Sequence, residues 1–168
     1  MGQMYEKKDK ILELFYRNPN KKFTVREIAK KTNISKSTVQ VYLNSLKKES
    51  LILKDNIASG SDYFKIKKTN YYVEKFFKVG LIDYLKQKLN PSCIILFGSI
   101  RKGDAVSESD IDLFLEMHHK LEINLSKFEK KLKHKIQVFS ETDIKKLPPK
   151  LFNNVVNGIK LYGSFKVK

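Results

Sequence analysis

Residues 96–116 read LFGSIRKGDAVSESDIDLFLE, and this stretch decides the fold of the second half of the chain. An apolar run of strand length, Cys93–Phe97, leads into Gly98-Ser99. Ten residues then separate Ser99 from a second apolar segment, which Asp110 opens. Short continuous apolar runs bounded by turn residues are typical of strands that are buried on both faces. The pattern therefore predicts two neighbouring core strands with a glycine-serine turn between them.

Two carboxylates stand at the start of the second strand, where Asp110 and Asp112 are two residues apart. In a strand, residues i and i+2 point to the same face of the sheet, so we expect these side chains to converge. Adjacent carboxylates repel each other unless a cation lies between them, and Mg²⁺ prefers such oxygen ligands while keeping water and phosphate oxygens as its others. The spacing predicts a site for Mg²⁺ or Mn²⁺.

The residues that follow the first strand provide groups for an anionic ligand. Glycine permits close approach of the backbone to a ligand, and the N–H groups and hydroxyl of Gly98 and Ser99 are suited to phosphate oxygens. Arg101 and Lys102 add a basic rim. A metal site, a phosphate cradle and positive charge are the parts that transfer of a phosphoryl-type group requires. We therefore expect a bound nucleoside triphosphate.

This arrangement resembles the polymerase-β-like nucleotidyltransferase superfamily, in particular its minimal stand-alone members, over about residues 92–163. The resemblance implies an α/β core with a small mixed sheet, and transfer of a nucleoside monophosphate to an acceptor with release of pyrophosphate. In it, Asp110 and Asp112 hold the metal while Gly98 and Ser99 hold the β and γ phosphates. Fully active members carry a third carboxylate on a later strand, where this sequence has Gln137. A glutamine forms hydrogen bonds but cannot accept the proton of a nucleophile.

Two functions therefore stay open at this point. The first is an enzyme that transfers a nucleoside monophosphate to an unknown acceptor, with a protein among the candidates. The second is a DNA-binding transcriptional regulator whose nucleotidyltransferase domain is degenerate and senses nucleotide or dimerises. A third, weaker interpretation follows the antitoxin-like members of the superfamily, which modify a partner nuclease.

The first half of the chain has three helical patterns, at about 5–16, 24–32 and 36–48, with a capping box at Thr24 and Glu27. Leu51–Leu53 and Tyr63–Ile66 read as β segments with turn residues between them. Residues 23–52, FTVREIAKKTNISKSTVQVYLNSLKKESLI, resemble the helix-turn-helix of a winged-helix DNA-binding domain, with 57–67 as the wing. Ser50 stands where glycine is usual before the Leu-Ile strand.

The third helix is the expected recognition helix, because an α-helix fits the major groove of double-stranded DNA. Polar residues on the side opposite its apolar stripe offer groups for phosphates and base edges. These candidate DNA-binding residues are Ser35, Lys36, Ser37, Thr38, Gln40 and Asn44. Lysines of the expected wing, Lys54 and Lys65 together with Lys67 and Lys68, extend the contact to the flanking backbone.

The composition of the 168-residue chain agrees with a polyanionic partner, since 34 Lys and Arg against 18 Asp and Glu give a net charge of +16. A single cysteine excludes an internal disulfide and a cysteine-based zinc cluster. No apolar run approaches the ~20 residues that cross a bilayer, and the amino terminus lacks the apolar core of a signal peptide. We expect a cytoplasmic protein without a membrane partner, and leave a homodimer open.

The predicted fold class is α+β. We expect a winged helix-turn-helix domain, made of three helices and a β wing, over residues 1–70. A connecting helix follows over residues 71–90, with a kink or break at Gly80. The nucleotidyltransferase-like α/β core with its small mixed sheet occupies residues 91–168.

Overall fold

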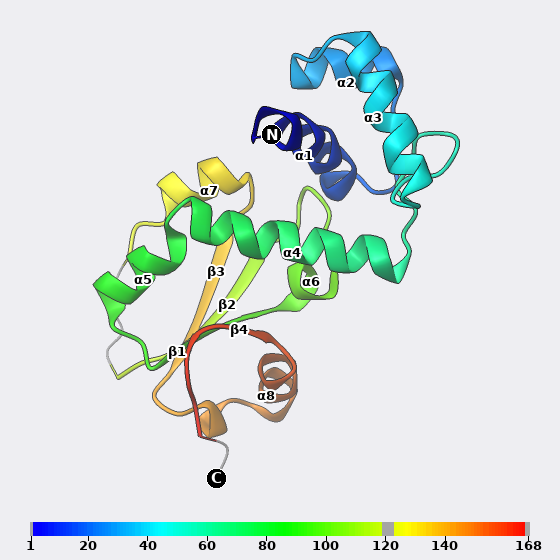
Figure 1. The fold of residues 1–168 in the computed structure, drawn as a ribbon. Coiled ribbons are helices and arrows are strands. Elements are labelled where there is room, and N and C mark those ends of the chain that lie inside the picture. Colours follow the sequence, from blue (N-terminus) through cyan, green and yellow to red (C-terminus); the bar gives the residue numbers. More distant parts are fainter. Residues whose placement is uncertain (1, 119–122, 167–168) are drawn as a thin grey trace. The chain divides into compact units, whose positions relative to one another are not determined.

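The computed structural model describes residues 2–118 and 123–166 (Figure 1). Two compact units make up the chain, Met1–Lys67 and Lys68–Lys168, and the boundary between them falls within helix α4 (Asp62–Lys78). The helical stretch breaks at Gly80, which adopts φ +77°, before α5 (Leu81–Leu89) begins. The assignment of residues 71–90 as a connecting segment stays a prediction. Among the described residues, none of the helices is both long and apolar enough to cross a membrane.

The first unit contains the three predicted helices, α1 (Gly2–Arg17), α2 (Val25–Thr32) and α3 (Lys36–Lys48). The capping box that opens α2 is formed, because the Glu27 N–H donates to the Thr24 hydroxyl at 3.2 Å and the Thr24 N–H donates to the Glu27 carboxylate at 2.8 Å. The core of this unit consists of buried apolar side chains from all three helices. They include Ile11, Phe15, Ile28, Val39, Leu43 and Leu46.

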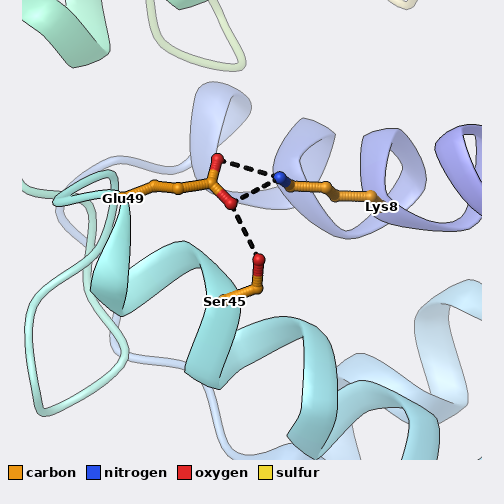
Figure 2. Close-up of polar contacts among 3 residues, drawn as sticks. All are labelled: Lys8, Ser45 and Glu49. Atoms are coloured by element: carbon orange, nitrogen blue, oxygen red, sulfur yellow. Dashed lines mark hydrogen bonds and ion pairs between the residues drawn. The ribbon is translucent and has the colours of Figure 1, made fainter.

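A polar contact joins α1 to the end of α3 (Figure 2). The ammonium group of Lys8 donates to both carboxylate oxygens of Glu49, at 2.6 and 2.8 Å, and the Ser45 hydroxyl donates to one of them at 2.7 Å. Burial raises the pKa of Glu49, but these hydrogen bonds outweigh it and hold the pKa below its usual value. The contact therefore favours the ionised carboxylate in the folded state.

The β wing is shorter than predicted, and the prediction of a second β segment at Tyr63–Ile66 is wrong. The β contact is the bridge between Ile52 and Ala58, whereas Tyr63–Ile66 lies inside α4. The Ser61 hydroxyl accepts the Phe64 N–H at 3.2 Å, which is a helix-capping bond, and the Phe64 ring packs against Tyr16 with 5.2 Å between ring centroids. Capping and burial of Phe64 together select the helix.

The second unit is built on a four-stranded mixed sheet with the strand order β3-β2-β1-β4. Strand β1 (Cys93–Phe97) pairs antiparallel with β2 (Ile111–Glu116) and with β4 (Ile159–Gly163). Strand β3 (Ile136–Glu141) pairs parallel with β2. The predicted α+β class and the small mixed sheet are confirmed.

Helices cover the two faces of this sheet (Figure 1). Residues of α4, α5 and α7 (Ser126–Leu132) form one apolar cluster with Ile94, Leu96 and Leu113. The opposite face carries Ile95, Phe97 and Phe114 and packs against α8 (Pro149–Val156) and the short 3₁₀ helix η1 (Ile144–Lys146). Alternate residues of the central strands thus enter two separate cores, which explains why β1 is apolar throughout and why Leu113–Leu115 of β2 form a continuous apolar run.

Candidate functional site

The two carboxylates lie at the start of β2, where Asp110 immediately precedes the strand and Asp112 is its second residue. Asp112 pairs with Phe97 of β1 and, on the other side, with Gln137 of β3. Directly paired residues of neighbouring strands project from the same face of a sheet. Gln137 therefore stands beside Asp112, on the face that also carries Phe97, and is exposed to solvent.

Gly98 lies so close to the Asp112 carboxylate that a residue with a side chain would clash with it. It has φ +73° and begins the short helix α6 (Gly98–Lys102), whose first turn contains Ser99. A Cβ atom built on Gly98 would lie 1.9 Å from Asp112 Oδ2 and 2.8 Å from Asp112 Cγ. The absent side chain therefore leaves room for the Asp112 carboxylate. The fold brings the Gly-Ser and Asp-Ile-Asp motifs into direct contact.

The electrostatics of Asp112 fit a cation-binding carboxylate. Burial raises the pKa of Asp112, and the like charge of nearby Asp110 raises it further. A cation between the two groups would offset both effects. Within residues 2–118 and 123–166, no group of three or more His, Cys, Asp or Glu side chains is arranged to hold a metal ion. Two carboxylates fit Mg²⁺, which commonly keeps several water and phosphate oxygens among its ligands.

Helix α6 is held in place from α4. The Thr69 hydroxyl donates to the Ile100 carbonyl at 3.0 Å and is 3.2 Å from the Arg101 carbonyl. The ammonium group of Lys68 donates to the Ala105 carbonyl in the loop that leads to β2. Lys68 is 1% exposed, so its predicted role as a wing lysine is wrong. The anchored helix carries Arg101 and Lys102 in its last turn, on the same short element as Ser99.

A cavity of about 460 Å³ has Asp110 in its lining. Its lining includes Asp110 and residues of α7 and of the turn that follows, among them Lys130 and Lys133. His134 in this lining is 5% exposed, and its ring nitrogens contact the Tyr72 hydroxyl at 2.9 Å and the Ser109 carbonyl at 2.6 Å. Gly98 and Asp112 are not among the residues that line it, so this cavity is separate from the contact between the two motifs.

The candidate DNA-binding residues of α3 gather on one exposed side of that helix. Val39, Leu43 and Leu46 are fully buried on the opposite side, as predicted. Ser35 is the N-cap, and its hydroxyl accepts the Thr38 N–H at 3.3 Å, so part of its role is structural. The exposed members of the predicted set are Ser35, Lys36, Ser37, Gln40 and Asn44, whereas Thr38 is half-buried.

Of the four predicted wing lysines, Lys54 alone lies in the wing, whereas Lys65, Lys67 and Lys68 belong to α4. Lys54 is exposed in the turn between Ile52 and Ala58, as expected for a wing. Lys65 is a half-buried residue of α4, because the wing ends before this helix begins. Sequence reasoning also missed Val41, whose side chain is 66% exposed on α3. The signal was its spacing, since Val41 lies four residues after Ser37 and three before Asn44.

In this mixed sheet, the helix with Gly98 and Ser99 follows the first strand, and the Asp-Ile-Asp motif lies at the start of the second. This arrangement is that of a nucleotidyltransferase-type domain. The family model "Polymerase beta, Nucleotidyltransferase" matches residues 80–166, which is more than half of the chain, and the protein belongs to this family. The model "HTH domain" matches residues 7–59. The predicted fusion of the two domains is therefore confirmed. No curated protein and no solved structure matches the chain.

Proposed function

We propose that the protein binds a nucleoside triphosphate together with Mg²⁺ or Mn²⁺ and transfers the nucleoside monophosphate to an acceptor. The observation that carries this proposal is the close approach of Gly98 to Asp112, because it brings the Gly-Ser turn, the proposed phosphate cradle, beside one of the two proposed metal ligands. Membership of the nucleotidyltransferase family supports the reaction class. The helix-turn-helix match supports a second activity, binding of double-stranded DNA by α3.

Each residue of the site has a defined task in this reaction. Asp110 and Asp112 ligate the cation, while the Gly98 and Ser99 N–H groups and the Ser99 hydroxyl donate to the β and γ phosphates. Arg101 and Lys102 add positive charge near the leaving group. When bound, Mg²⁺ neutralises triphosphate charge and favours departure of pyrophosphate. Transfer of this kind depends mainly on positioning and charge neutralisation, which these groups provide.

The acceptor hydroxyl or amine attacks the α phosphorus, and the bond from that phosphorus to the bridging oxygen breaks as pyrophosphate leaves. Gln137, the neighbour of Asp112 on β3, cannot take the acceptor's proton. The proton therefore passes to water or to a phosphate oxygen of the substrate, which predicts slow transfer. Protein side chains are among the acceptors that such chemistry accommodates.

Gln137 also favours a second candidate function. If transfer requires a third carboxylate, the site binds nucleotide without turnover, and the protein is a DNA-bound regulator that senses nucleotide. Nucleotide binding is common to both functions, whereas label transfer is specific to the enzyme. A cytoplasmic location, a homodimer and an antitoxin-like role are further proposals that these two functions accommodate.

The test compares the protein with the double variant Asp110→Ala/Asp112→Ala by calorimetric titration with Mg·ATP and the other three Mg·nucleoside triphosphates. We expect binding that the double variant abolishes. A matched control is Glu74→Ala/Asp83→Ala, which removes two exposed carboxylates from α4 and α5. Equal binding by the wild type and the site variant would reject the site.

A second measurement separates the two functions. The protein is incubated with α-labelled nucleoside triphosphates, Mg²⁺ or Mn²⁺ and cell extract, and transfer of label to a macromolecule is followed. Label that depends on Asp110 and Asp112 supports the enzyme. Nucleotide binding without label under every condition, together with tight DNA binding, supports the regulator.

A further inference from the structure

Val41 is the most exposed of the described large apolar side chains, at 66%, and it lies in the middle of α3. A β-branched residue has no advantage in an exposed helix position, because its side chain loses rotamer freedom there and gains no contact. Its apolar surface is therefore available to a partner of this helix.

The neighbours of Val41 on the same side of α3 are polar and exposed. Ser37, Gln40 and Asn44 lie four residues before, one before and three after it, so with Val41 they form one strip along the helix. Gln40 Nε2 donates to Asn44 Oδ1 at 3.1 Å. After this bond Gln40 keeps its carbonyl oxygen and one N–H, the acceptor and donor that the major-groove edge of adenine requires.

The charge of α3 favours a polyanion as the partner. The helix contains Lys36, Lys47 and Lys48 and has no acidic residue along its sequence KSTVQVYLNSLKK. A basic helix with a strip of amides, hydroxyls and one aliphatic group matches the major groove of DNA, where thymine is the base that presents a methyl group. An acidic protein would also be attracted by the positive charge of α3, but binding to it would not require the amides of Gln40 and Asn44 beside Val41.

We propose that Val41 is a specificity residue that contacts a thymine methyl group, and that Gln40, held by Asn44, reads an adenine beside it. The helix thereby selects DNA sites that contain A·T pairs at the centre of the contact. This inference rests on the proposed DNA binding and adds to it the bases that are read.

The experiment begins with selection of binding sites from randomised double-stranded DNA by the full chain. In the selected site each thymine is then replaced by deoxyuridine, which removes the methyl group and leaves base pairing unchanged. Dissociation constants are measured by fluorescence anisotropy for the wild type and for Val41→Ala. We expect one thymine at which deoxyuridine weakens wild-type binding about fourfold, the effect of one buried methyl group, and weakens Val41→Ala binding hardly at all.

Gln40 is tested in the same way with 7-deazaadenine, which lacks the N7 acceptor. Replacement of the adenine that Gln40 reads is expected to weaken wild-type binding about tenfold and to leave Gln40→Ala binding unchanged. The matched control is Ile66→Ala, which shortens a β-branched side chain that is 58% exposed on α4. This variant is expected to keep both base dependences.

Tight DNA binding in which no deoxyuridine replacement matters overturns the inference and leaves the proposed DNA binding intact. The same holds if Val41→Ala keeps the full methyl dependence. Selection of no DNA at all, with weak binding that does not respond to salt, overturns the DNA-binding function and this inference with it.

Discussion

The contact between Gly98 and Asp112 leads to the sharpest prediction, because a single added methyl group tests it. In Gly98→Ala the new Cβ would lie 1.9 Å from Asp112 Oδ2, 2.8 Å from Cγ and 3.1 Å from Cβ. Rotation about the Asp112 Cα–Cβ bond relieves the contact with Oδ2, but the contact with Asp112 Cβ remains, so the carboxylate has to leave its present position. We expect the variant to lose Mg·ATP binding.

The expected loss of unfolding free energy in Gly98→Ala has two parts, and the control variant Gly80→Ala separates them. An alanine at φ +73° costs roughly 1–2 kcal/mol of stability, and the steric contact adds about 1–3 kcal/mol. Gly80 has a similar φ of +77°, but a Cβ there would meet nothing within 4 Å. Gly80→Ala is therefore expected to lower the free energy of unfolding by the first part only, and to bind Mg·ATP as the wild type does.

Urea denaturation gives the free energies of unfolding, and calorimetric titration with Mg·ATP gives the affinities. We expect Gly98→Ala to bind at least about tenfold more weakly than Gly80→Ala, the range seen when groups that orient metal ligands are disturbed. Equal stability losses and equal, wild-type affinities in the two variants would refute the placement of Asp112 against Gly98.

Three further predictions concern β3, the Lys8–Glu49 contact and α3. Gln137→Asp adds a third carboxylate beside Asp112 and should raise the rate of label transfer by about 10²-fold, the contribution of a general base; an unchanged rate would show that no base is missing. Glu49→Gln should lower the free energy of unfolding at neutral pH by less than about 1 kcal/mol, since the Glu49 side chain is 38% exposed. Because the folded-state pKa of Glu49 is depressed, this stabilisation is present above its usual value of 4.5 and disappears as pH falls through the folded-state pKa, so urea titrations at a series of pH values should converge in acid. Lys36→Ala should weaken DNA binding and reduce the slope of log affinity against log salt by about one, whereas an unchanged slope would place Lys36 away from phosphate.

The local pattern was sufficient to predict the three helices of the first unit and the two strands beside the Gly-Ser turn. Thr24 and Glu27 form the expected capping box at the start of α2. Ser50 stands where glycine is usual and adopts φ +56°, the left-handed conformation that a glycine would adopt there. Its N–H donates to the Lys47 carbonyl at 3.0 Å. These features depend on interactions within a few residues, which is why the sequence reveals them.

The segment 61–66 shows where such reasoning stops. A short apolar run fits a strand or a helix equally well, and the turn-rich residues before it suggested a hairpin. The Ser61 cap and the packing of Phe64 against Tyr16 decide for the helix, and Tyr16 is 48 positions away in the chain. The position of Lys65 outside the wing and the burial of Lys68 both follow from that one choice.

The sequence alone determined the candidate residues for the proposed chemistry, because the two-residue spacing of Asp110 and Asp112 and the glycine before Ser99 are properties of the chain itself. Tertiary structure decided which of these residues meet. The register of β1, β2 and β3 places Gln137 beside Asp112, and the close approach at Gly98 places the Gly-Ser turn against the Asp112 carboxylate. Strand register and helix packing depend on apolar surfaces far apart in sequence, so no local pattern could have fixed those neighbours.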